Sequence, residues 1–519
     1  MRTQHSTISR RDFMKGLGLA GAGLGAVAAT TPVFHDMDEF VSSEANSPKD
    51  QPWYVKHREH FDPTITVDWD IFDRYDGYQH KGVYEGPPDA PFTSWGNRLQ
   101  TRMSDEEQKK RILAAKKERF PGWDGGLHGR GDQRADALFY AVTQPFPGSG
   151  EEGHGLFQPY PDQPGKFYAR WGLYGPPHDS APPDGSVPKW EGTPEDNFLM
   201  LRAAAKYFGA GGVGALNLAD PKCKKLIYKK AQPMTLGKGT YSEIGGPGMI
   251  DAKFYPKVPD HAVPINFKEA DYSYYNDAEW VIPTKCESIF TFTLPQPQEL
   301  NKRTGGIAGA GPYTVYKDFA RVGTLVQMFI KKLGYHALYW PIGWGPGGCF
   351  TTFDGQGEQG RTGAAIHWKF GSSQRGSERV ITDLPIAPTP PIDAGMFEFC
   401  KTCHICRDVC VSGGVHQEDE PTWDSGNWWN VQGYLGYRTD WSGCHNQCGM
   451  CQSSCPFTYL GLENASLVHK IVKGVVANTT VFNSFFTNME KALGYGDLTM
   501  ENSNWWKEEG PIYGFDPGT

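Results

Sequence analysis

Eight of the eleven cysteines in this chain lie between positions 400 and 455. They form two runs, Cys400-x2-Cys403-x2-Cys406-x3-Cys410 and Cys444-x3-Cys448-x2-Cys451-x3-Cys455-Pro456. In such a run, three closely spaced thiolates wrap around one cubane iron–sulfur cluster, and the fourth cysteine reaches across to a second cluster. The sequence therefore predicts a domain that holds two 4Fe–4S clusters and transfers electrons.

The crossing of the fourth cysteines defines two ligand sets. One cluster is assigned Cys400, Cys403, Cys406 and Cys455, and the other Cys410, Cys444, Cys448 and Cys451. Val411 stands where the first run often has proline, and three residues instead of two open the second run, but neither departure removes a ligand. Structural zinc prefers two separated cysteine pairs, and such close spacing disfavours disulfides. The remaining cysteines are expected to be small buried residues or free thiols, namely Cys223, Cys286 and Cys349.

The N-terminus has the pattern of an export signal. Residues 9–15 are Ser-Arg-Arg-Asp-Phe-Met-Lys, and residues 16–29 are uncharged and rich in glycine and alanine. This pattern predicts a twin-arginine signal, whose apolar part is shorter than the roughly 20 residues that span a membrane. Cleavage fits equally well after Ala29 and after Ser43, so the signal is placed within residues 1–43. Because this route exports folded proteins, it suits a protein that receives its clusters before export.

The charge of the chain limits its partners. The net charge is −8, and no basic run follows the leader, which argues against nucleic acid and against direct adhesion to anionic lipid. No segment after the leader resembles a transmembrane helix. A membrane association is therefore expected to need a partner protein.

Composition and periodicity divide the rest of the chain into four segments. Residues 44–190 are rich in proline, glycine and aspartate and are expected to form an irregular N-terminal unit with one helical run at 105–118. Residues 191–391 alternate helices and short strands, which favours an α/β or α+β core. Residues 392–462 hold the cysteines. Residues 463–519 form a tail whose aromatic side chains are expected to pack on the body, namely Trp505, Trp506, Tyr513 and Phe515.

Local signals place the main elements of the core. A helix is expected to start at the capping residue Thr193, with Pro194 in its first turn, and to end at the glycines that begin with Gly209. A second helix is expected over residues 312–333, from Pro312 to the glycine at 334. Strands are expected at 213–218, 335–340 and 379–385.

Two glycine stretches match the string G-x-G-x-x-G. In residues 209–214 the order is helix, glycines, strand, the reverse of a dinucleotide-binding fingerprint, so this stretch is interpreted as a helix C-cap. The second stretch contains Gly355, Gly357, Gly360 and Gly363 and leads into an extended segment at 364–370. These glycines would let the backbone approach a large flat ligand, and a tight surface turn explains them equally well.

The residues before the cysteines contain no H-E-x-x-H, H-x-x-E-H or D-x-H-x-x-G string. A reaction centre there is therefore expected to be organic, or to be a cofactor bound without a protein axial ligand.

Several of these features together resemble the respiratory reductive dehalogenases: the leader at 9–15, the cluster motifs ending in Cys455-Pro456, the helix exit at 332–335, the glycine loop at 357–363 and the segment 382–384. The resemblance extends over nearly the whole chain. It implies reductive dehalogenation of chlorinated ethenes, such as vinyl chloride and dichloroethenes, in organohalide respiration. It also implies an α+β fold, in which residues 191–391 form a nitroreductase-like core that binds a base-off corrinoid (cobalamin) beside a two-cluster ferredoxin-like domain.

By the same resemblance, the glycine loop at 355–363 would approach the corrinoid, and Tyr316 and Arg375 would be catalytic. Tyr316 would donate a proton to the substrate carbon, because a neighbouring cation stabilises the phenolate that is left. Arg379 is the alternative cation. The small Ala320 and Gly323 on the same helix are expected to leave room beside the Tyr316 ring.

The resemblance also implies partners and a location. These are a small integral-membrane anchor protein, the twin-arginine export machinery and a low-potential electron donor, with the enzyme held peripherally on the outer face of the cytoplasmic membrane. A competing interpretation is an exported iron–sulfur electron-transfer subunit that has no substrate site of its own.

Overall fold

The computed structural model describes residues 51–52, 54–75, 157–160, 163–169, 188–231, 263–276, 278–297, 300, 305–339, 344–410, 413–426, 430–440, 449–459, 467–492 and 505–507. Some of the predictions concern residues outside these stretches: the signal at 1–43, the helical run at 105–118, and the side chains Cys444, Cys448, Tyr513 and Phe515.

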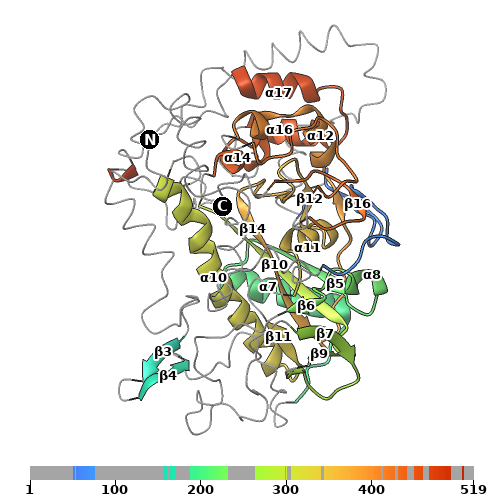
Figure 1. The fold of residues 1–519 in the computed structure, drawn as a ribbon, viewed down its shortest axis with the longest axis vertical. Coiled ribbons are helices and arrows are strands. Elements are labelled where there is room, and N and C mark those ends of the chain that lie inside the picture. The colour runs from blue at the N-terminus through green and yellow to red at the C-terminus, as the bar shows by residue number, and fades with distance from the viewer. Residues whose placement is uncertain are drawn as a thin grey trace.

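A four-stranded antiparallel sheet lies at the centre of the fold (Figure 1). Its strands run in the order β11 (Ala337–Tyr339), β14 (Gln374–Thr382), β10 (Ser288–Pro295) and β5 (Gly212–Asn217). On strand β10, Ile289 lies opposite both Leu216 and Ile381. The three strands expected in the core are thus present, although β14 begins at residue 374 instead of 379. An antiparallel sheet covered by helices is an α+β arrangement.

Alternation along the strands gives this sheet two buried faces. The first face packs against helices, with the side chains Ala215, Phe290, Phe292, Ala337, Tyr339 and Val380. The second face joins a larger core cluster, with the side chains Leu216, Ile289, Leu338 and Ile381. Because both faces are covered, the polar residues of these strands are buried as well, among them Thr291 and Thr293 on β10 and Glu378 and Arg379 on β14.

Helix α7 (Pro194–Phe208) has the ends that the sequence predicts. The Thr193 hydroxyl accepts a hydrogen bond from the Asp196 N–H at 3.1 Å, which caps the first turn. Gly209 ends the helix with a φ of 115° and donates its N–H to the Lys206 carbonyl at 3.0 Å. The interpretation of residues 209–214 as a helix C-cap followed by a strand is confirmed.

Helix α10 (Gly305–Lys332) crosses the first face of the sheet and begins earlier than predicted. Its apolar side chains face the sheet: Val315, Phe319, Val322, Val326 and Ile330 are buried, and Phe329 and Leu333 are partly buried. The predicted start at Pro312 is wrong, because this proline lies inside the helix. Packing stabilises the helical turns that precede Pro312. Ile307 and Ala310 form a buried cluster with Leu300, and Trp505 and Trp506 pack on that cluster. These two tail tryptophans therefore contact the body, as expected.

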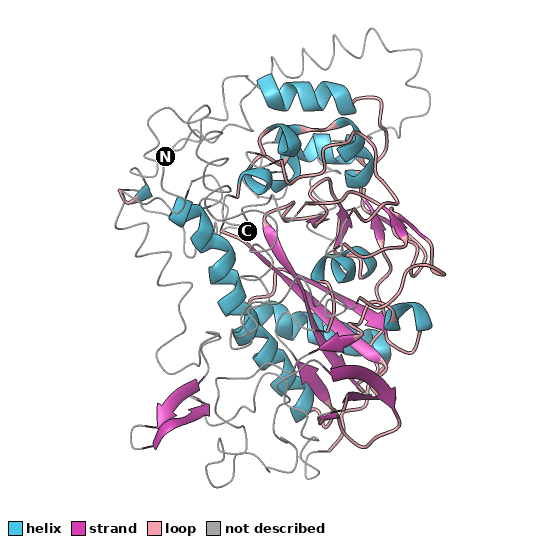
Figure 2. Ribbon diagram, in the orientation of Figure 1, coloured by secondary structure: helices cyan, strands magenta, loops and turns pink. Residues whose placement is uncertain are grey.

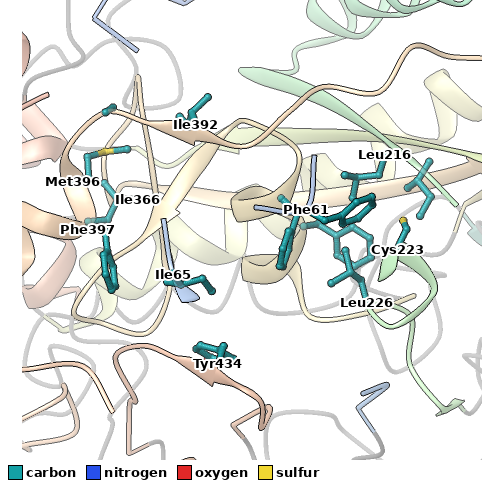
Figure 3. Packing of buried hydrophobic residues seen from close by; sticks show 14 of the residues in the cluster. Phe61, Ile65, Leu216, Cys223, Leu226, Ile366, Ile392, Met396, Phe397 and Tyr434 are labelled. Atoms are coloured by element: carbon teal, nitrogen blue, oxygen red, sulfur yellow. The ribbon is translucent and has the colours of Figure 1, made fainter. Parts of the chain in front are cut away.

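The second face of the sheet is covered by helix α11 (Gly347–Phe353), by the hairpin of β12 (Gly357–Gln359) and β13 (Ala365–His367), and by residues 54–75. Phe61 and Ile65 of that N-terminal stretch belong to the same cluster as Leu216, Ile366 and Tyr434 (Figure 3). Strand β1 (Lys56–His57) pairs with β15 (Ile392–Asp393), and β2 (Thr66–Val67) pairs with β16 (Tyr434–Leu435). Residues 54–75 thus join the sheet to the cysteine-bearing part of the chain.

Smaller elements complete the described structure. Helix α8 (Pro221–Lys224) precedes a second sheet with the order β6 (Lys230–Ala231), β7 (Val263–Lys268), β9 (Trp280–Pro283) and β8 (Tyr274–Tyr275). Strands β3 (Phe157–Tyr160) and β4 (Gln163–Ala169) form a hairpin. Helices α16 (Leu467–Val476) and α17 (Asn483–Ala492) gather with the cysteine-bearing helices at one end of the molecule (Figure 2). No described helix is both long and apolar enough to cross a bilayer.

Candidate functional site

Short helices present the cysteines of the two runs. Cys400 lies in helix α12 (Met396–Thr402), Cys403 ends that helix, and Cys406 lies in α13 (Ile405–Asp408). From the second run, Cys451 lies in α14 (Met450–Ser453), and Cys455 immediately precedes α15 (Pro456–Tyr459). Short helices linked by tight turns bring closely spaced thiols to one side of the backbone.

Five of these cysteines line one cavity, namely Cys400, Cys403, Cys406, Cys451 and Cys455. The structure thus brings together the four thiols assigned to the first cluster, although Cys455 comes from the other run. Cys451, assigned to the second cluster, borders the same cavity, while Cys410 is outside its lining. Within the described stretches, no three His, Cys, Asp or Glu side chains are placed to hold a single metal ion. A cubane cluster binds one thiolate at each iron and so does not require the sulfurs to converge on one point.

The environment of the sulfurs fits an iron–sulfur cluster. Burial raises the thiol pKa of the whole first set, to about 12 for Cys403, and neighbouring cysteines raise the pKa of Cys400 and Cys406 further. The Cys455 sulfur also receives hydrogen bonds from the Ser372 hydroxyl and from the backbone N–H groups of Ser372, Phe457 and Thr458. Iron takes the place of the thiol proton, and such hydrogen bonds stabilise the bound thiolate. The role of these cysteines as cluster ligands stays a prediction.

The three cysteines outside the runs lie in apolar surroundings. Cys223 and Cys286 are buried in the larger core cluster, and Cys349 packs against it. Burial raises the pKa of Cys286 to about 12 and that of Cys349 to about 11. These thiols are neutral at physiological pH, as expected for small core residues.

The glycine loop of the sequence forms the β12–β13 hairpin, and this hairpin contacts the cysteine-bearing segments. A side chain at Gly355 would strike the Pro390 carbonyl, one at Gly357 the Ile366 carbonyl, and one at Gly360 the Ile366 side chain. Gly363 has a φ of 69°, which favours glycine. Close packing within the protein thus accounts for all four glycines, and their contact with a corrinoid stays a prediction.

Two charged residues between these glycines were missed by the sequence reasoning. The Glu358 carboxylate accepts hydrogen bonds from the N–H groups of Ala394, Met396 and Phe397 at the start of α12. The Arg361 guanidinium donates to the carbonyls of Cys400 and Cys403 near the end of the same helix. A glutamate and an arginine in a loop whose other residues are uncharged were the available signal, because buried charges need partners.

The two residues predicted to be catalytic lie next to each other. Arg375, at the start of β14, places its guanidinium carbon 5.6 Å from the centre of the Tyr316 ring on α10. The ring also packs against Tyr313 and Phe319, with centroids 5.9 and 6.0 Å away. Arg375 lies near the cysteine cavity. Ser372 lines that cavity, and the three residues from Ser372 to Arg375 span no more than about 11 Å.

The alternative cation has other neighbours. Arg379 is buried, lies over the Phe350 ring at 5.1 Å and donates to the Ser377 carbonyl. Among the described cation–ring contacts, Arg375 and not Arg379 meets Tyr316. The expected space at Gly323 is filled, because a side chain there would overlap the ring of Tyr339.

Buried polar atoms without protein partners lie beside this pair. In the described part of the chain, Gln296 Oε1, Gln374 Oε1 and Arg375 Nε make no hydrogen bond. Gln296 Nε2 donates to Gln452 Oε1 at 3.0 Å, which connects the end of β10 to the residue after Cys451. Two free amide oxygens and a guanidinium N–H fit a ligand with amide groups on its rim, which a corrinoid has.

Comparisons with known proteins identify the family. A family model described as the reductive dehalogenase subunit matches residues 169–386. The chain is 98% identical over 515 residues to the chloroethene reductive dehalogenase of Dehalococcoides mccartyi strain VS, covering 99% of both chains. It is 38% identical over 556 residues to the trichloroethene reductive dehalogenase of Dehalococcoides mccartyi strain 195, covering 98% of both.

Solved structures agree at the level of the fold. A variant of the catabolic reductive dehalogenase NpRdhA aligns with a TM-score of 0.50 at 14% identity, covering 88% of this chain and 51% of that one. A reductive dehalogenase structure described as suggesting a mechanism for B12-dependent dehalogenation aligns with a TM-score of 0.50 at 15% identity, covering 90% and 55%. The chain belongs to the reductive dehalogenase family of enzymes.

Proposed function

We propose that this enzyme removes chlorine reductively from chlorinated ethenes, vinyl chloride and dichloroethenes among them, as the terminal reductase of organohalide respiration. The observation that carries the proposal is 98% identity, over 99% of both chains, to a chloroethene reductive dehalogenase. In the reaction a carbon–chlorine bond is replaced by a carbon–hydrogen bond. Two electrons and one proton are consumed and one chloride ion leaves.

The cofactors we propose are a base-off corrinoid and two 4Fe–4S clusters. Cys400, Cys403, Cys406 and Cys455 hold the first cluster, and the remaining cysteines of the runs hold the second, within a ferredoxin-like domain at 392–462. Residues 191–391 form a nitroreductase-like core for the corrinoid, in which the side-chain amides of Gln296 and Gln374 would hold amide groups of the cofactor. When bound, the corrinoid supplies a low-valent cobalt that reduces the organohalide.

The residues of the chain supply the proton and its setting. The Tyr316 hydroxyl donates the proton to the substrate carbon, and the adjacent Arg375 guanidinium stabilises the phenolate. The packing of the partly buried Tyr316 ring against Phe319 holds the ring in place. The strand that carries Arg375 begins beside the cysteine cavity, which suits electron delivery from the clusters.

We further propose export by the twin-arginine route and a peripheral position on the outer face of the cytoplasmic membrane. The leader at 9–15 supports the export route. A small membrane-anchor protein and a low-potential donor are the partners that such a location requires.

Anaerobic turnover tests the activity. The purified protein, reconstituted with corrinoid and iron–sulfur clusters, is expected to convert vinyl chloride to ethene with a low-potential donor, as followed by gas chromatography. Its visible spectrum should contain both corrinoid and cluster bands. Cluster absorbance without corrinoid bands and without ethene would favour an electron-transfer subunit instead.

A tyrosine variant tests the proton donor. Tyr316→Phe removes the hydroxyl and keeps the ring, so turnover should fall at least about a hundredfold while corrinoid and iron contents stay at the wild-type level. Tyr313→Phe is the matched control, because Tyr313 touches the same ring and should keep most of the activity. Wild-type turnover in Tyr316→Phe would rule out this role.

A further inference from the structure

Arg361 is a buried cation at the edge of the cysteine cavity. Its side chain comes from the loop between β12 and β13 and is 1% exposed. Of the described residues that line the cavity, it is the one with a permanent charge. The positive charge therefore lies beside the thiols assigned to the first cluster.

The guanidinium is bound entirely by backbone carbonyls and one ring. It donates to the Cys400 carbonyl at 2.8 Å, the Cys403 carbonyl at 3.3 Å, the Asp419 carbonyl at 2.7 Å and the Glu418 carbonyl. Its carbon lies 4.8 Å from the centre of the Tyr437 ring. These contacts fix the end of helix α12, which carries Cys400 and Cys403.

No carboxylate forms an ion pair with the Arg361 guanidinium within the part of the chain that the structure describes, although its charge, after the hydrogen bond from Arg407, helps to lower the pKa of the exposed Asp419 carboxyl. The nearby Asp419 carboxylate is instead paired with Arg407, at 2.7 Å. A buried guanidinium without a counter-ion is costly, because carbonyl dipoles replace only part of its hydration. A negatively charged group bound in the cavity would therefore balance this buried cation.

The same hairpin holds both ends of helix α12. Glu358 accepts the N–H groups at its start, and Arg361 binds carbonyls at its end. A negative group at the N-terminus and a positive group at the C-terminus both complement the helix dipole. The placement of Cys400 and Cys403 therefore depends on two charged residues of one hairpin, Glu358 and Arg361. Neither of them supplies a sulfur ligand.

We propose that Arg361 is a positioning residue that holds the end of helix α12, with Cys400 and Cys403, and raises the reduction potential of the cluster assigned to Cys400, Cys403, Cys406 and Cys455. This inference rests on the cluster assignment proposed above. A cubane cluster with four thiolates is anionic and gains one further negative charge on one-electron reduction. A buried cation beside it stabilises the reduced state more than the oxidised state.

Redox titration of the reconstituted full-length protein, followed by electron paramagnetic resonance, tests the proposal. Arg361→Gln should lower one of the two midpoint potentials enough to change the reduction equilibrium at least about tenfold, which is about 59 mV for one electron. Arg361→Lys keeps the charge and should restore most of that shift. Arg74→Gln is the matched control, because Arg74 also donates to backbone carbonyls, those of Ile227, Tyr228 and Ile265, and does not line the cavity.

Iron content distinguishes loss of a cluster from a change in its reduction potential. An Arg361→Gln protein with full iron and wild-type potentials overturns the proposal. If Arg361→Gln loses iron, retention by Arg361→Lys supports a requirement for the charge, and equal loss by both variants overturns it. Absence of any iron–sulfur signal in the wild-type protein would instead contradict the cluster assignment.

Discussion

Replacing Glu358 with alanine should loosen the helix that carries Cys400. Glu358 Oε1 accepts from the Ala394 N–H at 2.7 Å and the Met396 N–H at 3.2 Å, and Oε2 accepts from the Phe397 N–H at 3.2 Å. Met396 and Phe397 belong to the first turn of α12, whose N–H groups have no acceptor within the helix, and Ala394 lies just before the capping residue Gly395. Because the site is buried, Glu358→Ala leaves three N–H groups without partners.

The cost follows from the number of donors. A buried donor left unsatisfied costs about 1–3 kcal/mol. At the lower end of that range, three donors cost about 3 kcal/mol, which corresponds to roughly a hundredfold change in an opening equilibrium. Native-state hydrogen exchange measures this directly, so amides of residues 394–403 should exchange roughly a hundredfold faster in the variant. The effect is expected to be local, because the hydrogen bonds described for this carboxylate all come from residues 394–397.

The pH of the exchange experiment matters. Burial raises the pKa of the Glu358 carboxyl to about 7, the nearby Asp393 adds to the rise, and the three backbone N–H groups oppose it. Exchange is therefore best compared at about pH 8, where the carboxylate accepts through both oxygens. Glu398→Ala is the control, since Glu398 lies on the same helix, is 48% exposed and pairs with Lys401 at 2.7 Å, a contact of about 0–1 kcal/mol. Wild-type protection of residues 394–403 in Glu358→Ala would refute the reasoning.

Two further predictions concern the core. Burial raises the pKa of Asp354 to about 6, against hydrogen bonds from Thr291, Ser377 and Gln356. The protonated carboxyl therefore contributes about 3 kcal/mol to the free energy of unfolding, which is fully present below about pH 4 and is lost as the pH rises through 6. Asp354→Asn should remove the dependence of the melting temperature on pH across that window. An unchanged dependence in the variant would contradict the raised pKa of Asp354. Gly323→Ala should destabilise the protein by about 1–3 kcal/mol in thermal unfolding, because the added methyl overlaps Tyr339, whereas Gly348→Ala, which meets only ordinary contacts, should melt like the wild type.

Local sequence signals determined the elements whose ends depend on nearby residues. Thr193 and Gly209 bound helix α7 as predicted, because capping involves atoms within one turn of the helix. The start of α10 was wrong for the opposite reason. Burial of Ile307 and Ala310 holds a helical segment ahead of Pro312, and a proline signal carries no information about that packing.

The sequence by itself also determined which cysteines are candidate ligands, since the spacing of ligands within one loop is a local property. Only the tertiary structure decided which segments meet. It placed Cys451 beside the first ligand set, Arg375 beside Tyr316, and Glu358 and Arg361 at the two ends of α12. These contacts join segments far apart in the chain, and the packing on the two faces of the central sheet sets their distances, which no local pattern encodes.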